Sequence, residues 1–323
     1  MQPTQRFLSF IRRAVGQKQT LQLLQQLQQQ HQLQHQQYWQ QQQQLLALAN
    51  GLQYLFTDRE AVKATTTYKR CAEIVSLLSP MDVEGAKYSR VGKDFDGGYV
   101  MLENFEATTI DAAYSFGIAD DASWDEEIAN RGIDVYMYDH TIDKLPSAHR
   151  RFRYFKLGIT GDEKDKNLNT LNDILAKNGH TQRNNLIMKM DIEGCEWDVF
   201  QYAETGILDQ FSQIVVEFHG LVAAVYDREA LMTVVSVLQK INKTHQSVHV
   251  HANGSSVPLL IGGLALPDVM EVSYLRRRGG KHKFIPNTRQ FPTELDQPTF
   301  QSGHDVYLGR FEGDQTTNWH VSD

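Results

Sequence analysis

Short apolar runs alternate with longer helical stretches through the middle of the chain. These runs occupy residues 111–118, 133–139, 152–159, 186–192 and 213–219. Such alternation predicts an α/β fold in which a mostly parallel sheet carries helices on both faces. After one more helical stretch come two further strand-like runs, 247–254 and 268–277. They predict an antiparallel pair that finishes the sheet at one edge.

The segments on either side of this pattern differ from it in composition. Residues 17–44 contain seventeen glutamines in twenty-eight positions. We interpret residues 1–50 as a Gln-rich low-complexity arm, either a helical or disordered extension or a helix for self-association. Residues 51–323 form the main domain, with a helical lead-in over 51–84 that stops near Pro80. Its tail is expected to wrap the domain, with 304–311 as a candidate last strand.

Charge and cysteine content narrow the classes of protein. A net charge of −7 and a pI near 5.9 argue against a general affinity for nucleic acid or for anionic membranes. Two cysteines are too few for a disulfide scaffold and favour a reducing compartment, so we expect a cytoplasmic location. No apolar stretch approaches the roughly 18 residues of a membrane span. The basic run at 276–283 either binds nucleic acid or, as we favour, recognises an anionic acceptor beside the site.

The strand ends supply candidate site residues, because ligands of open α/β sheets bind outside the carboxyl ends of the strands. The residues at these ends are Gly117, Asp139, Gly158, Asp191 and Glu217. Gly117 lets the backbone come close to a ligand. Asp139 follows it at about the spacing at which a carboxylate accepts hydrogen bonds from ribose hydroxyls.

The loop after the first strand does not suit a diphosphate. Its sequence, SFGIADDAS, has one glycine where a dinucleotide fingerprint needs three. The carboxylates of Asp120 and Asp121 would repel a diphosphate at the start of a helix. S-adenosylmethionine carries a sulfonium and an ammonium group and lacks phosphate, so acidic strand ends favour a methyltransferase over a dehydrogenase.

Five segments together resemble the FkbM-type family of S-adenosylmethionine-dependent methyltransferases. They are 90–102, 115–142, 189–200, 215–219 and 249–277, and KMDIEGCE within the third resembles the family's K-[IM]-D-[IV]-E-G-x-E signature. The resemblance implies a Rossmann-like class I methyltransferase fold, S-adenosylmethionine as donor, and commonly O-methylation of a saccharide or secondary metabolite. The cofactor contacts that we expect are Asp96, Gly97, Gly98, Tyr99, Phe116, Gly117, Asp139, His140, Gly158, Asp191 and Glu193.

Three mechanisms remain open for the acceptor. Asp191 and Glu217 could hold a divalent cation such as Mg²⁺ that lowers the pKa of an acceptor hydroxyl. Alternatively, His219 or His251 acts as a general base, or the site only aligns the reactants. The predicted catalytic residues are therefore Asp191, His219 and His251, whereas Glu196 is expected to have a helix-start role. The alternative from another class is a non-catalytic binding protein that oligomerises through its Gln-rich arm and keeps a vestigial methyltransferase domain.

Overall fold

The computed structural model describes residues 59–103, 109–162, 167–278, 282–301, 303 and 305–313. The chain divides into two units, residues 1–55 and 56–323, and every described residue belongs to the second unit. The Gln-rich arm predicted for residues 1–50 lies outside the described residues. Among those that are described, no helix has both the length and the apolar character needed to cross a membrane.

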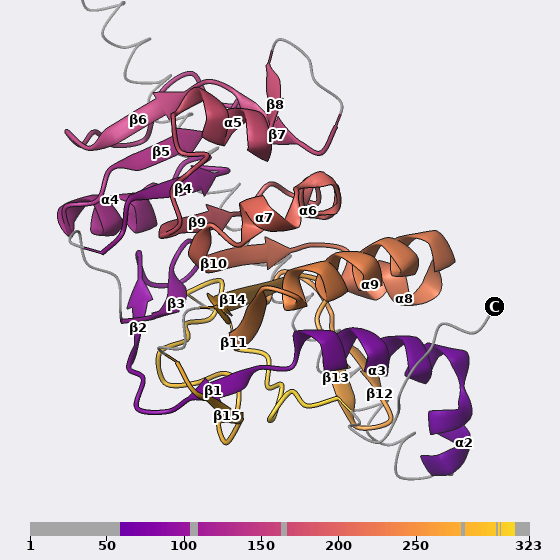
Figure 1. The fold of residues 1–323 in the computed structure, drawn as a ribbon. Coiled ribbons are helices and arrows are strands. Elements are labelled where there is room, and N and C mark those ends of the chain that lie inside the picture. Colours follow the sequence, from indigo (N-terminus) through magenta and orange to yellow (C-terminus); the bar gives the residue numbers. More distant parts are fainter. Residues whose placement is uncertain are drawn as a thin grey trace, which may run out of the picture. The chain divides into compact units, whose positions relative to one another are not determined.

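A seven-stranded sheet forms the centre of the second unit (Figure 1). Its strands, in spatial order, are β11 (His245–Ala252), β14 (Met270–Arg276), β10 (Phe211–Phe218), β9 (Leu186–Met190), β4 (Ala112–Phe116), β5 (Val135–Tyr138) and β6 (Phe152–Phe155). From β10 to β6 all neighbours are parallel, and β14 is antiparallel to both of its neighbours. The predicted mostly parallel sheet with antiparallel pairing near one edge is confirmed.

The two faces of this sheet have separate cores. Ala112, Tyr114 and Phe116 point into one core, and Ala113, which lies between Ala112 and Tyr114, points into the other, as the two-residue period of a strand requires. The first core also receives side chains of α3, α5, α6, α8 and α9. The second is covered by α4, through Trp124 and Ile128, and by β2 and β3. Helices therefore pack on both faces, as the alternating pattern predicts.

The remaining elements surround the sheet. The helices are α2 (Arg59–Ala64), α3 (Thr66–Leu78), α4 (Ser123–Asn130), α5 (Leu171–Lys177), α6 (Glu196–Tyr202), α7 (Thr205–Leu208), α8 (Leu221–Tyr226) and α9 (Arg228–Asn242). Four small strand pairs are β1 (Met81–Val83) with β15 (Phe284–Pro286), β2 (Tyr88–Val91) with β3 (Tyr99–Leu102), β7 (Gly158–Thr160) with β8 (Leu168–Thr170), and β12 (Leu259–Ile261) with β13 (Leu264–Leu266).

Two expected strands differ from the structure. The run 152–159 is not one strand, because the chain bends after β6 and its last residues form β7, which pairs with β8 outside the main sheet. The bend is a tight turn in which the amide of Leu157 donates to the carbonyl of Phe155 at 2.7 Å. In the described part of the run 304–311, residues 305–311 do not form a strand, and Gly309 makes only an isolated bridge with Phe291.

Buried ion pairs attach the C-terminal tail to edge strand β11. His249 Nε2 lies 2.8 Å from Asp296 Oδ1. His251 lies between two carboxylates, with Nδ1 3.1 Å from Glu271 Oε2 and Nε2 2.9 Å from Asp305 Oδ1. Both histidines are almost completely buried. Polar side chains, rather than an additional strand, therefore hold the tail against the sheet.

Candidate functional site

A cavity of about 370 Å³ opens at the carboxyl ends of β4, β5 and β9. The chain runs outward from β4 to β5 and β6 and then returns to β9 on the other side of β4, so this is the point where the strand order reverses. Ligands of open α/β sheets bind at such a point. The predicted site residues that line the cavity are Asp96, Gly97, Tyr99, Gly117, Asp139, His140, Gly158, Asp191 and Glu193.

The ends of β4 and β9 are in close contact at Gly117. The amide of Asp191 donates to the carbonyl of Phe116 at 3.0 Å, and Lys189 Nζ donates to the carbonyl of Gly117 at 2.6 Å. Gly117 has a φ of +78°, and a Cβ added there would lie 1.6 Å from the backbone oxygen of Asp191. The chain therefore needs glycine at this position. The side chain of Phe116 is buried in the core against Tyr138, so it does not line the cavity.

Asp139 connects the end of β5 to the loop after β4. Its Oδ2 accepts hydrogen bonds from the amides of Ile118 and Ala119 at 2.9 and 3.0 Å. Its Oδ1 accepts from the amide and the hydroxyl of Thr141 at 2.7 and 2.6 Å. Burial raises the pKa of this carboxyl, but the hydrogen bonds from Thr141, Ala119 and Ile118 bring it below its ordinary value. Asp139 is therefore ionised and shapes the loop that forms one wall of the cavity.

The DGGY segment lies beside that same loop, at the turn of the β2–β3 hairpin. Lys93 donates its amide to Ser123 Oγ at 2.9 Å, and its Nζ lies 3.5 Å from Asp121 Oδ2. A Cβ on Gly97 would come within 2.1 Å of that carboxylate oxygen. Gly97 therefore permits the close packing of the two loops, whereas Gly98 packs against the backbone of Lys93 and does not line the cavity.

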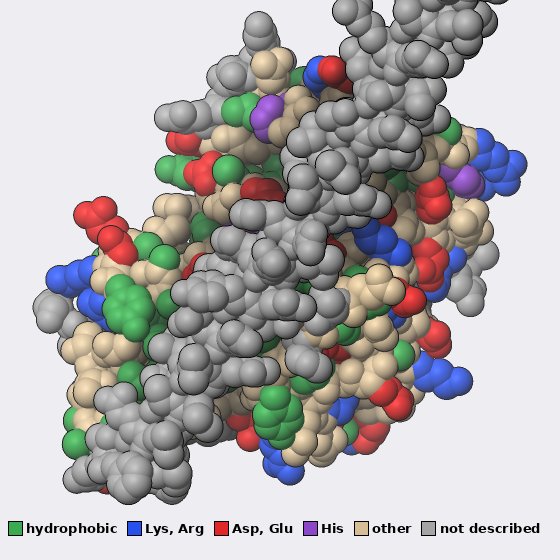
Figure 2. Space-filling model, turned by 180° about the vertical axis from the view of Figure 1, so that it is seen from behind, with side chains coloured by type: hydrophobic (Ala, Val, Ile, Leu, Met, Phe, Trp, Pro, Cys, Tyr) green, Lys and Arg blue, Asp and Glu red, His purple; other side chains and the backbone are tan. Residues whose placement is uncertain are grey.

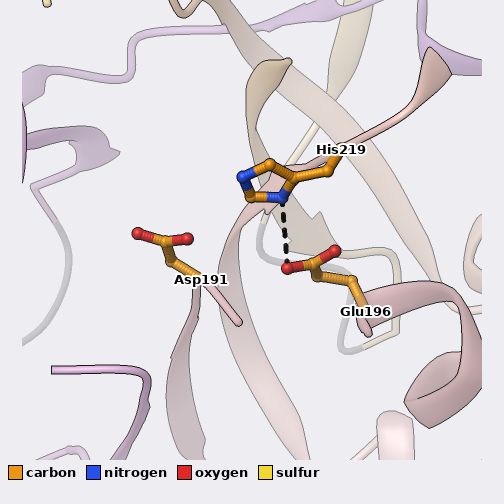
Figure 3. A group of neighbouring side chains, drawn as sticks. All are labelled: Asp191, Glu196 and His219. Atoms are coloured by element: carbon orange, nitrogen blue, oxygen red, sulfur yellow. Dashed lines mark ion pairs between the residues drawn. The ribbon is translucent and has the colours of Figure 1, made fainter. Parts of the chain in front are cut away.

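Three side chains from separate segments meet at one end of the site. One ligand atom each from Asp191, Glu196 and His219 lies within 4.8 Å of the other two, and Figure 3 shows the ion pair between His219 and Glu196. Their closest atoms, His219 Nδ1 and Glu196 Oε1, are 3.3 Å apart. The Glu196 carboxylate is fully buried and also accepts hydrogen bonds from the amides of Ile192 and Gly194.

Glu196 is the residue of this group that sequence reasoning missed as a functional candidate. It does begin helix α6, as the expected helix-start role requires. Its carboxylate, however, also fixes the loop between Asp191 and the helix and lies beside His219. The signal was present as the second glutamate of the EGCE sequence, but the distance to a histidine 23 positions later could not be read from the chain.

Two further carboxylates lie next to His219 Nε2. Glu217 Oε1 is 3.5 Å away and accepts a hydrogen bond from Asn253 Nδ2 at 3.0 Å, and Glu193 Oε2 is 3.6 Å away. Burial, together with the charges of Asp191 and Glu271, raises the pKa of Glu217 well above its ordinary value. Burial lowers the pKa of His219, but Glu196 and the neighbouring acids outweigh it and raise the pKa overall.

His251 does not join this group. Its Nδ1 contacts Glu271 of strand β14, and its Nε2 contacts Asp305 of the tail. These two contacts hold the imidazole against the tail rather than beside Asp191. Of the two histidines predicted as bases, only His219 lies beside Asp191.

Two arginines of the basic run at 276–283, Arg276 and Arg278, lie away from the cavity. Arg276 donates to the carbonyls of Asn184 and Asp209, and Arg278 Nε lies 3.0 Å from Asp209 Oδ2. Asn184 and Asp209 precede β9 and β10, so these arginines lie at the amino ends of the strands. Our expectation that this run recognises an acceptor beside the site is therefore wrong for Arg276 and Arg278. Figure 2 shows basic and acidic side chains intermixed over the visible part of one face.

Asp125 in helix α4 is a buried acid outside the cavity lining. It is 1% exposed, and neither carboxylate oxygen has a hydrogen-bond partner. Burial raises the pKa of its carboxyl to about 6, although the charge of Lys189 opposes this shift. Relative to the unfolded chain, the stability associated with this group is present below pH 3.8 and is lost as the pH rises through about 6.

We expect Asp125→Asn to stabilise the protein at alkaline pH, because the amide removes the buried charge. The free energy of unfolding should rise by up to about 3 kcal/mol at pH 8 and by roughly half as much at pH 5. Urea denaturation at the two pH values measures this difference. The exposed Asp94→Asn is the control and should change stability by less than about 0.5 kcal/mol. An equal gain at both pH values would show that the carboxyl is not titrating.

The strand order and the cavity at its reversal point define the protein as a Rossmann-like α/β protein. A family model described as a methyltransferase domain matches residues 78–245, more than half of the chain. The chain therefore belongs to this family of methyltransferase domains. No curated protein matches it. Among solved structures, one titled "Putative hemolysin from Streptococcus thermophilus" is similar with a TM-score of 0.32 and 9% identity, over 57% of this chain and 73% of that one.

Proposed function

We propose that the protein is an S-adenosylmethionine-dependent methyltransferase that methylates an oxygen of a saccharide or small metabolite. The main support for this proposal is the cavity at the ends of β4, β5 and β9, whose lining includes Asp120, Asp121, Asp191 and Glu193. Such a lining suits a donor with a sulfonium and an ammonium group and disfavours a diphosphate. Membership of the methyltransferase family supports methyl transfer, and the oxygen acceptor rests on the resemblance of the sequence motifs.

In this proposal the cofactor contacts are the nine predicted residues that line the cavity. Gly117 brings the backbone of β4 against the ligand, and Gly158 stands opposite it on β7. Asp139 acts by holding the amides of Ile118 and Ala119 in place, since its own oxygens already accept four hydrogen bonds. A ribose hydroxyl that bonds to Asp139, as the spacing predicts, would therefore share the carboxylate oxygens with Thr141 and the loop amides.

The acceptor would bind next to Asp191, which lines the cavity and has His219 beside it. Bound S-adenosylmethionine would supply the methyl group. The acceptor oxygen would form the new C–O bond as the C–S bond breaks, and the electron pair of that bond would remain on sulfur. The acceptor proton would leave to a base or to solvent. Asp191 and His219 would orient the acceptor there. His219 would take the proton directly, or these residues would hold a cation that lowers the pKa of the acceptor.

Calorimetric titration with S-adenosylhomocysteine tests the cofactor assignment. We expect the wild type to bind it and Asp139→Ala to bind it about ten to a hundred times more weakly, because the substitution releases the loop after β4. Asp143→Ala is the matched control, since this aspartate is almost fully exposed and contacts Lys156 instead of the cavity loop. A wild type that does not bind the ligand would overturn the proposal and favour a vestigial domain with a binding role.

Incubation with candidate acceptors tests the reaction itself. Glycans and small hydroxylated metabolites treated with enzyme and donor should gain the mass of one methyl group. Fragmentation of the product locates that group on oxygen or on nitrogen. Methylation of nitrogen alone would leave the enzyme class intact and overturn the proposed oxygen acceptor.

A further inference from the structure

Four carboxylates surround the imidazole of His219, next to the part of the cavity that Asp191 and Glu193 line. His219 has Glu196 on its Nδ1 side at 3.3 Å, and Glu217 and Glu193 on its Nε2 side at 3.5 and 3.6 Å. Asp191 completes the group, with a ligand atom within 4.8 Å of those of Glu196 and His219. Asp191 and Glu193 follow strand β9, and Glu196 begins helix α6. Glu217 and His219 lie at the end of β10.

Several oxygens of this group have no hydrogen-bond partner although they are buried. Glu217 is only 5% exposed, and its Oε2 has no partner, while its Oε1 faces His219. Asp191 Oδ1 is likewise buried without a partner. A buried carboxylate oxygen that loses its hydration without a replacement is costly. The orphaned oxygens therefore point to a ligand that carries positive charge.

The neighbouring cationic side chains are already engaged elsewhere. Lys189 Nζ donates to the carbonyl of Gly117 at 2.6 Å. His251 is held between Glu271 and Asp305. Neither of these two side chains bonds to the unpaired oxygens of Asp191 and Glu217, so these oxygens remain available to a bound cation.

We propose that Asp191, Glu196 and His219 bind a divalent metal ion, with Glu217 as an additional carboxylate ligand. A set of carboxylates with one imidazole suits a first-row transition ion such as Mn²⁺ or Zn²⁺ better than Mg²⁺, which prefers oxygen ligands alone. This differs from the sequence expectation of Mg²⁺ on Asp191 and Glu217. Glu196 is well suited to the role because the amides of Ile192 and Gly194 fix its carboxylate in place.

The role of the metal ion rests on the proposed function, whereas its binding does not. In methyl transfer to a hydroxyl group, the ion would bind the acceptor oxygen and lower its pKa, so that the proton leaves before or during formation of the C–O bond. His219 would then serve as a ligand instead of a general base. Binding of the ion can be measured without any acceptor.

Electron paramagnetic resonance of Mn²⁺ added to chelator-treated full-length protein tests this proposal. Loss of the signal of free Mn²⁺ reports binding, and we expect a single site per chain. Asp191→Asn and His219→Gln should each weaken Mn²⁺ binding at least about tenfold. Zn²⁺ should displace Mn²⁺ at equal concentration, and Mg²⁺ should not. Circular dichroism of each variant checks that it is folded.

Asp120→Asn is the matched control, because it removes the same charge from the lining of the same cavity outside the group around His219. It should leave Mn²⁺ affinity within about twofold of wild type. The proposal would be overturned if the wild type bound no Mn²⁺. It would also be overturned if Asp120→Asn and Asp191→Asn lost Mn²⁺ affinity equally. Calorimetry with S-adenosylhomocysteine on the same preparation separates the two proposals. Protein that binds S-adenosylhomocysteine but not Mn²⁺ overturns only the metal site. Protein that binds Mn²⁺ but not S-adenosylhomocysteine overturns only the cofactor assignment.

Discussion

Replacing Gly117 with alanine is expected to abolish S-adenosylhomocysteine binding and to lower the free energy of unfolding by about 2–5 kcal/mol. Two physical effects add at this position. Gly117 has a φ of +78°, which L-residues rarely adopt, and the new Cβ would lie 1.6 Å from the backbone oxygen of Asp191. Strands β4 and β9 would have to separate at the cavity. Affinity should fall more than about a hundredfold, a loss near 2.7 kcal/mol.

A second glycine separates the two effects. Gly179 has a similar φ of +72°, but no atom lies within 4 Å of the position that its Cβ would take. Gly179→Ala should therefore cost only about 1–2 kcal/mol and leave ligand affinity unchanged. Calorimetry and urea denaturation of both variants provide the comparison. Equal losses of stability in the two variants, or intact binding in Gly117→Ala, would contradict the close approach of β4 and β9.

Replacing His251 with glutamine is expected to lower the free energy of unfolding by about 3–5 kcal/mol, because the buried Glu271 and the partly buried Asp305 lose their cationic partner. The imidazole lies 3.1 Å from Glu271 and 2.9 Å from Asp305, and it is 2% exposed. Urea denaturation at pH 6 measures the effect. His149→Gln is the control, since this histidine contacts only its own loop, and it should cost less than about 1 kcal/mol.

The loss of stability in His251→Gln is expected to depend on pH. Burial lowers the pKa of His251, but Glu271 and Asp305 outweigh burial and raise it well above 6.5. A histidine with a raised pKa contributes stability that is complete below its unfolded pKa and is lost as the pH rises through the folded value. The difference between wild type and His251→Gln should therefore shrink at alkaline pH. A difference that grows with pH would show that His251 is neutral in the folded protein.

The sequence predicted the sheet well because each strand is a short apolar run bounded by polar residues. Six of the seven runs form one strand of the main sheet at nearly the expected bounds. The run 152–159 failed as a single strand, since apolar character continues through a turn at Leu157 that periodicity does not detect. The run 304–311 failed as a strand for a different reason: in its described part, 305–311, a polar contact between Asp305 and His251 of β11 holds the chain in place.

The candidate site was predicted in part. The carboxyl ends of parallel strands meet at one edge of a sheet, so reading those ends identified Gly117, Asp139 and Asp191, which line one cavity. The surroundings of the histidines could not have been judged in this way. His249 and His251 alternate on one strand face, and each contacts an acid of the tail. Those partners lie 47 and 54 residues further along the chain.

By itself, the sequence determined the fold class and the edge of the sheet where the cavity lies, because both follow from local hydrophobic periods and from strand direction. Only the tertiary structure decided which acids act together. It brought Glu196 against His219, satisfied Asp139 with loop amides, and turned Arg276 and His251 away from the site. Such pairings depend on loop conformation and on contacts between distant segments, and neither leaves a periodic signal in the chain.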